Sequence, residues 1–218
     1  KPFAVNLFIP SGGTEDADRI MRANKELATY RAELGLADAE PLTAPMPNYT
    51  EQLGVLFEES VKIISFTFGI PAAKEMESIK QQNITTIASA THLFEAILLE
   101  ESGIDIVVAQ GYEAGGHRAT FVGDAYQSLI GTVALVPLLV EHLSVPVIAA
   151  GGIMDGRGIA ASLALGADGA QLGTAFLASP ESGAHRKYKE RLQRGTELNT
   201  VLTRAFSGKL ARGLKNRF

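Results

Sequence analysis

The sequence predicts an α/β fold built on a parallel sheet, and three observations support this prediction. Short runs rich in β-branched residues are apolar on both faces, which is typical of strands covered on both sides. Helical patterns separate these runs, so strands and helices alternate along the chain. Strand starts at 62, 84 and 104, and at 145 and 170, are separated by 22, 20 and 25 residues. That spacing resembles the repeat of a (β/α)8 TIM barrel.

The elements follow one another in strict order. The predicted strands are Phe3–Phe8, Lys62–Phe68, Ile84–Ala88, Ile104–Gln110, Val145–Ala150 and Ala170–Gly173. The predicted helices are Glu15–Leu34, Tyr49–Ser60, Pro71–Gln82, Thr91–Ser102, Ser128–Leu143, Gly156–Leu165 and Pro180–Arg194. Six strands in 218 residues leave two topologies open. The sheet is either open and doubly wound, or a barrel of about 250 residues that lacks two βα units.

No composition shift or low-complexity linker interrupts the chain, so we expect a single domain over residues 1–218 with an insertion at about residues 10–61. The insertion contains a polar helix, a loop with three prolines (Pro41, Pro45 and Pro47) and a second helix that carries Leu53, Val55 and Leu56. Long connections in compact domains are usually functional. We therefore expect these three apolar side chains to close over the site as a lid.

Composition excludes several classes of function. The 20 basic and 24 acidic side chains give a net charge of −4, which does not favour nucleic acid as a partner. The absence of cysteine rules out thiolate chemistry and favours a cytoplasmic location. No apolar run has the roughly 18 residues of a membrane helix, and the start at Lys1 carries no secretory pattern. The histidines are dispersed, so no metal site is predicted.

Two neighbouring strands end in glycine. Gly151 and Gly152 follow the strand Val145–Ala150, and Gly173 with Thr174 ends the next strand. Backbone N–H groups without side chains in front of them, beside a helix N-terminus, are a common phosphate site at the carboxyl end of a barrel. This pattern predicts a phosphorylated ligand or cofactor at these residues.

A second glycine-rich segment carries the predicted acid or base. His117 follows Gly115 and Gly116 on the loop that leaves strand Ile104–Gln110, at the edge where parallel-sheet active sites lie. An unobstructed histidine there is a candidate general base near neutral pH. The other histidines lie in helical patterns and are assigned no role, and the basic stretch Lys209–Arg217 is interpreted as a solvated surface.

Several motifs together resemble the nitronate monooxygenase family, formerly called 2-nitropropane dioxygenase. The resemblance covers essentially the whole chain. It rests on Pro2–Leu7, Ser65–Gly69, Gln110–His117, Pro146–Ile153, Asp155–Gly158, Leu165–Ala167, Gln171–Phe176, Phe206–Lys209 and Ala211–Gly213.

The resemblance implies an incomplete FMN-dependent (β/α)8 barrel, with six of eight strands present and two βα units expected ahead of Pro2. It implies oxidation of alkyl nitronates, and by extension nitroalkanes, by O2 to carbonyl compounds and nitrite. His117 would be the catalytic residue. The residues that would bind FMN are Asn6, Gln110, Gly115, Gly116, Gly151, Gly152, Gly173 and Thr174. The alternatives are an FMN-dependent enoyl-acyl-carrier-protein reductase, a phosphate-handling isomerase or lyase, and a non-catalytic flavin-binding protein.

Overall fold

A six-stranded parallel sheet forms the centre of the protein. The computed structural model describes residues 2–10, 16–37 and 48–217. The strands lie in the order β1-β2-β3-β4-β6-β7, and every neighbouring pair is parallel. Their bounds are β1 (Val5–Phe8), β2 (Ile63–Thr67), β3 (Thr85–Ala90), β4 (Ile106–Gln110), β6 (Val147–Ala150) and β7 (Gly169–Gln171). All six predicted strands are therefore confirmed, with shifts of a few residues at their ends.

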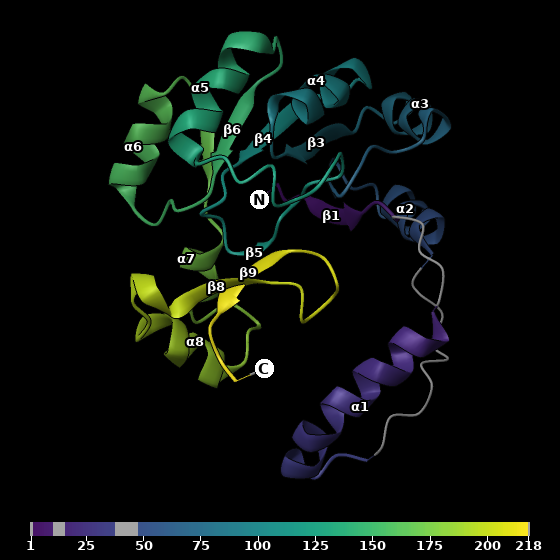
Figure 1. Ribbon diagram of the computed structural model, residues 1–218. Helices are drawn as coiled ribbons and strands as arrows, with labels where there is room; N and C mark the ends of the chain where they lie inside the picture. The colour runs from purple at the N-terminus through teal and green to yellow at the C-terminus, as the bar shows by residue number, and fades with distance from the viewer. Residues whose placement is uncertain (1, 11–15, 38–47, 218) are drawn as a thin grey trace.

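Helices cover the outer side of this sheet, which curves into an arc in Figure 1. They are α2 (Tyr49–Glu58), α3 (Ala73–Gln81), α4 (Leu93–Glu101), α5 (Thr132–His142) and α6 (Gly156–Ala164). The core lies between helices and sheet, where Phe66, Leu99 and Leu135 are almost fully buried. In the described part of the chain, β1 and β7 each pair with one parallel neighbour. The sheet is thus an open arc, as the prediction of an incomplete barrel requires.

The inner face of the arc is more polar and more accessible than predicted. Asn6 on β1 is exposed and Ser65 on β2 is half-buried, whereas their neighbours Leu7 and Ile64 point into the core. No helix of the described residues lies against this inner face (Figure 1). The prediction that both faces of the strands are covered is therefore correct only for the outer face.

The predicted lid over the site is wrong for two of its three residues. Leu53 and Leu56 on α2 are buried in the main hydrophobic core, while Val55 faces solvent. Burial of the apolar stripe of an amphipathic helix explains this placement. The three prolines of the same insertion lie outside the described residues.

Helix α1 (Ala17–Leu34) stands apart from the sheet in Figure 1 and contains no buried residue. Asp16 caps its first turn by accepting a hydrogen bond from Arg19 N at 3.0 Å, and Gly35 ends it with a φ of 63°. Its contact with the rest of the chain includes a bond from Tyr30 Oη to Arg217 O at 2.9 Å.

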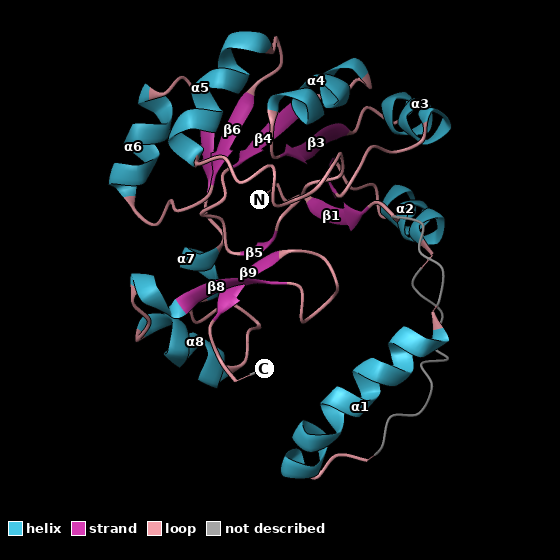
Figure 2. Ribbon diagram, viewed as in Figure 1, coloured by secondary structure: helices cyan, strands magenta, loops and turns pink. Residues whose placement is uncertain are grey.

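A second, antiparallel sheet was missing from the predictions. It consists of β5 (Gly116–His117), β9 (Ala211–Leu214) and β8 (Thr200–Thr203), in that order. Figure 2 shows it beside α7 (Thr174–Leu177) and α8 (Arg186–Gln193), on the side of the molecule away from α3 and α4. The interpretation of Lys209–Arg217 as a solvated surface is therefore wrong for Leu210 and strand β9, whereas Lys215, Asn216 and Arg217 are exposed. Leu210 and Ala211 are only 2% and 7% exposed, because β9 lies between two strands.

Candidate active site

The carboxyl ends of β4 and β6 approach each other so closely that glycine is required. A Cβ on Gly151 would lie 2.8 Å from Thr132 Oγ1 and 3.1 Å from the carbonyl oxygen of Gly111. Gly151 also has a φ of +121°, and Gly152 a φ of +70°, which side chains other than glycine rarely adopt. These glycines therefore fix where the backbone turns away from the sheet.

The loop after β4 also reaches the first turn of α7. A Cβ on Gly115 would lie 2.7 Å from Thr174 Oγ1, whereas a Cβ on Gly173 would meet nothing within 4 Å. Within the described ranges, the backbone N–H groups of Gly152 and Gly173 donate no hydrogen bond. This edge thus offers free N–H donors with open space before Gly173, which fits an anionic group such as a phosphate.

Glu113 anchors the same loop to helix α5. Its carboxylate accepts hydrogen bonds from the backbone N of Thr132, at 3.0 and 3.1 Å, and from Thr132 Oγ1 at 2.8 Å. A carboxylate at a helix N-terminus satisfies a free N–H group and interacts favourably with the helix dipole. Glu113 therefore has a structural role that the glycine-based prediction did not include.

His117 lies on β5, where Ala211 of β9 is its partner across the small sheet. Its Nε2 is 2.5 Å from Ser207 Oγ. The imidazole meets the ring of Phe68 edge to face, with 5.7 Å between the ring centroids. Lys209 Nζ lies 4.4 Å from the centroid of the same Phe68 ring. The histidine is thus held between the segment that follows β2 and the segment that precedes β9.

Asn6 lies on the side of the site nearest Phe68. Its Oδ1 accepts hydrogen bonds from Ser65 Oγ at 2.9 Å and from Thr67 Oγ1 at 3.1 Å. Strand β1 is at one edge of the sheet and β7 is at the other. Among the predicted cofactor residues, those after β4, β6 and β7 are therefore brought together, whereas Asn6 stands apart from them across the arc.

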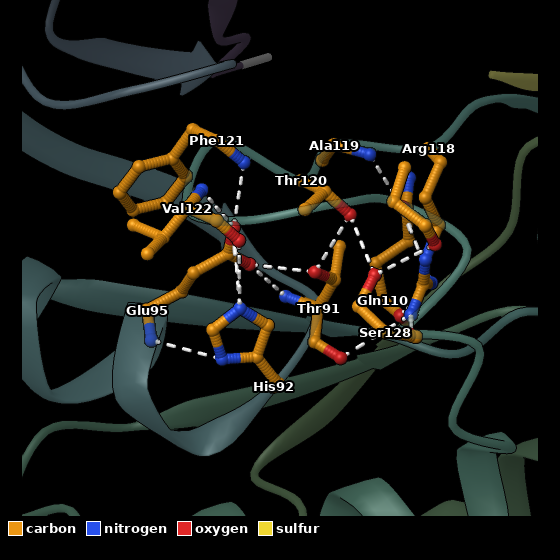
Figure 3. Close-up of polar contacts among 11 residues, drawn as sticks. Thr91, His92, Glu95, Gln110, Arg118, Ala119, Thr120, Phe121, Val122 and Ser128 are labelled. Carbon is orange, nitrogen blue, oxygen red and sulfur yellow. Dashed lines mark hydrogen bonds and ion pairs between the residues drawn. The ribbon is translucent and has the colours of Figure 1, made fainter.

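A buried polar network lies behind His117, and Figure 3 shows it. Glu95, which is fully buried, accepts hydrogen bonds from the backbone N atoms of Thr91 at 2.7 Å, Phe121 at 2.6 Å and Val122 at 2.9 Å. Arg118 is 5% exposed. Burial lowers the pKa of Arg118 to about 10, while Glu95 and Glu113 act in the opposite direction. Arg118 therefore remains charged at neutral pH.

Sequence reasoning missed Ser207, Phe68, Lys209, Glu95 and Arg118 as parts of this arrangement. Phe68 and Ser207 are far from His117 in the sequence, so no local pattern links them. Glu95 stands in a helical pattern, where a carboxylate is usually solvated. The one available signal was that Phe68 and Ser207 both belong to motifs of the family resemblance.

Within the described ranges, no group of three or more His, Cys, Asp or Glu side chains is placed to hold a metal ion. None of the helices in those ranges combines the length and the apolar character of a membrane span.

Comparison with known proteins connects this geometry to one family. A family model described as nitronate monooxygenase matches residues 1–218. A probable nitronate monooxygenase of Staphylococcus saprophyticus is 44% identical over 219 residues, which is 100% of this chain and 62% of that protein. One from Staphylococcus haemolyticus is also 44% identical, with the same shares covered. The chain thus spans about 62% of the length of these curated relatives.

Solved structures agree with the sequence comparison. A nitroalkane oxidase from Streptomyces ansochromogenes is 39% identical with a TM-score of 0.88, covering 100% of this chain and 62% of the other. FabK from Thermotoga maritima is 33% identical with a TM-score of 0.69, covering 96% of this chain and 63% of the other. The likeness to these structures confirms the predicted barrel-type α/β fold with six of its strands in this chain.

Proposed function

The chain belongs to the nitronate monooxygenase family, and from this premise we propose that the protein is an FMN-dependent oxidoreductase. Its substrates are alkyl nitronates and neutral nitroalkanes, which it oxidises with O2 to carbonyl compounds and nitrite. The observation that carries the proposal is the position of His117. It lies on the loop that leaves the carboxyl end of β4 and is held by Ser207, and Gly115 of the same loop approaches Thr174 at the start of α7.

The residues present fit a flavin mononucleotide. Gly151, Gly152, Gly173 and Thr174 would hold the phosphate, because Gly152 and Gly173 have free N–H donors and the space before Gly173 is open. Asn6, Gln110, Gly115 and Gly116 would line the ring system, as the family resemblance implies. When bound, the flavin supplies the electron acceptor that passes electrons on to O2.

His117 supplies the proton transfer that a neutral nitroalkane needs. The carbon next to a nitro group must lose a proton before oxidation, and a histidine is suited to take it near neutral pH. Ser207 Oγ holds Nε2, whereas Nδ1 has no hydrogen-bond partner in the described part of the chain. We therefore propose that Nδ1 is the atom that accepts the proton taken from the nitroalkane. A nitronate has already lost this proton, so its oxidation does not require the base.

The surroundings of His117 suit an anionic intermediate. Phe68 and Phe8, whose ring centroids are 5.3 Å apart, form an apolar wall beside the imidazole. Lys209 Nζ stands over the Phe68 ring and supplies a positive charge near the developing nitronate. A fixed positive charge beside the point where negative charge develops stabilises the transition state.

A second candidate is an FMN-dependent enoyl-acyl-carrier-protein reductase that takes its electrons from NADH, the alternative predicted from sequence, and the likeness to FabK favours it. The two candidates differ in what reduces the flavin. We mix the FMN-loaded protein with NADH without oxygen, and separately with a nitronate in air. Nitrite release and O2 uptake that depend on the nitronate, with slow flavin bleaching by NADH, support the monooxygenase. Fast bleaching by NADH without nitronate-dependent O2 uptake would replace it with the reductase.

A further inference from the structure

The side-chain amide of Gln110 binds the backbone on both sides of Arg118. Gln110 Nε2 donates to the carbonyl oxygen of His117 at 3.1 Å, and Gln110 Oε1 accepts from the N–H of Ala119 at 2.9 Å. A donor and an acceptor two residues apart are the pair that a neighbouring strand would normally satisfy. The side chain at the end of β4 therefore takes the place of a strand for the segment that carries His117.

The side chain of Arg118 in turn binds the main chain of Gln110. One terminal nitrogen of its guanidinium donates to the main-chain carbonyl of Gln110. The other donates to the carbonyl oxygens of Ser128 and of Thr91, the latter at 3.2 Å. Figure 3 shows Gln110, Arg118 and Ser128 gathered at this point. Hydrogen bonds between side chain and main chain thus join Gln110 to the segment around Arg118 at the base of the intervening loop.

The first half of that loop is held by Glu113, which binds the N-terminus of α5, and by the bond from Tyr112 N to the carbonyl oxygen of Ile130 at 2.9 Å. The loop as a whole is rich in glycine. It contains Gly111, Gly115 and Gly116, and strand β5 adds only the residue pair Gly116–His117. Glycines lower the cost of alternative backbone conformations, so the base of such a loop determines where its end lies. Gln110 donates its hydrogen bond to the carbonyl oxygen of His117 itself, at the end of this loop.

We propose that Gln110 is a positioning residue for His117, acting through the backbone of residues 117–119. The proposal rests on the proposed function for its catalytic consequence. The family resemblance implies that Gln110 lines the flavin, and one N–H of its amide is left for such a contact. Our proposal differs from that role, because it gives the Gln110 amide the principal task of fixing the position of His117. Loss of the amide therefore impairs proton abstraction more than it impairs FMN binding.

The test compares Gln110→Leu with Thr120→Val in the FMN-loaded enzyme. Both variants remove a polar group from the same network with little change in volume. Thr120 Oγ1 contacts Thr91 Oγ1 at 2.9 Å and Ser128 Oγ at 2.8 Å but makes no bond to His117. Three quantities are measured: amide hydrogen exchange at Ala119, the Kd for FMN, and kcat/KM for a nitroalkane and for its nitronate.

In Gln110→Leu we expect faster exchange at Ala119, because its acceptor is lost. We expect kcat/KM for the nitroalkane to fall on the order of 10²-fold, since displacement of a catalytic group by about 1 Å has that effect. The fall for the nitronate is at least tenfold smaller, and the Kd for FMN changes little. Thr120→Val changes neither the Ala119 exchange nor the ratio between the two substrates.

Two results would overturn the proposal. Equal losses of kcat/KM on both substrates with a raised Kd for FMN would make Gln110 a flavin ligand. Unchanged exchange at Ala119 would show that the Gln110 side chain does not hold the backbone of residues 117–119. If the unmodified enzyme oxidises neither substrate, the proposed function fails. The positional part of the inference is then decided by the Ala119 exchange alone.

Discussion

At the scale of single residues, the imidazole of His117 is held by a serine that lies 90 positions later in the chain. The bond to Ser207 Oγ fixes the ring orientation, and in the proposed mechanism it leaves Nδ1 to accept the substrate proton. Phe68 limits rotation of the ring from another side. A base that is fixed in this way is ready for proton transfer before the substrate arrives.

Ser207→Ala removes this hydrogen bond. We expect kcat/KM for a neutral nitroalkane to fall about fivefold, which corresponds to the roughly 1 kcal/mol of a typical hydrogen bond. Oxidation of the nitronate changes less, because no proton is abstracted. Steady-state O2 uptake measures both rates, with Ser182→Ala, a serine remote in sequence from these contacts, as the matched control. Equal rates for Ser207→Ala and the unmodified enzyme on the nitroalkane would show that this bond does not position the base.

The sequence singled out His117 as the candidate base, and this stays a prediction, but it did not indicate the residues that surround it in the structure. The glycine pair before it is a local signal, and so is its place after a strand. Ser207 and Phe68 reach it only through the fold, because β9 and the end of β2 must first be in place. Arg118 was hidden for a different reason. An arginine is usually solvated, and the burial of this one is offset by three carbonyl oxygens around its guanidinium and by the negative charges of Glu95 and Glu113.

At the scale of elements, the end of β7 and the start of α7 give the clearest test of the phosphate site. Gly173→Ala adds a methyl group that meets no protein atom, at a φ of −100° that alanine accepts. We therefore expect unchanged thermal stability of the flavin-free protein and an increase of about tenfold or more in the Kd for FMN, equivalent to about 1.4 kcal/mol. Fluorescence titration with FMN measures the Kd.

Gly183→Ala is the control for this substitution, because a Cβ there also meets nothing within 4 Å. It lies outside the predicted phosphate site and should leave the Kd unchanged. If Gly173→Ala binds FMN as tightly as Gly183→Ala does, the phosphate does not bind at this helix start.

Strand β9 supports the candidate site from the far end of the chain. Leu210, which precedes it, is 2% exposed, and its carbonyl accepts a hydrogen bond from Arg118 N at 2.8 Å. We expect Leu210→Ala to lower the free energy of unfolding by about 3 kcal/mol, as for other buried leucines. Urea unfolding measures the change. Leu198→Ala, at a leucine that is 79% exposed, should leave the unfolding midpoint unchanged. Equal midpoints for the two variants would return residues 209–217 to the surface role predicted from sequence.

Elements differ in how well their sequences predict them. The six parallel strands are short apolar runs rich in β-branched residues, so their composition, their length and the helical patterns between them identify them. The small sheet has strands of two and four residues, and β9 contains an arginine and a glycine. Neither β5 nor β9 is a continuous apolar run, so no local pattern identifies them. They form because β5, at the end of the glycine loop, provides a partner for β9.

At the scale of the whole molecule, the protein is an open arc of six βα units with a small antiparallel sheet near the carboxyl ends of its strands (Figures 1 and 2). The spacing of strand starts predicted a barrel-like repeat but left the topology open, and the family resemblance implied the incomplete barrel. Neither could predict that the base would be fixed by a second sheet, because that depends on contacts between residues about 90 positions apart. The central claim is therefore that this second sheet and the glycine-ended strands together form one flavin-dependent site with His117 as its base.

The most direct test is O2 uptake and nitrite release by the FMN-loaded His117→Ala variant, with a neutral nitroalkane and with the nitronate prepared from it. His142→Ala, at an exposed histidine on α5, is the control. We predict that His117→Ala loses about 10²- to 10⁴-fold in kcat/KM on the nitroalkane, as expected for removal of a general base. It should lose far less on the nitronate, and His142→Ala should lose nothing on either. Unchanged turnover of the nitroalkane by His117→Ala would contradict the account.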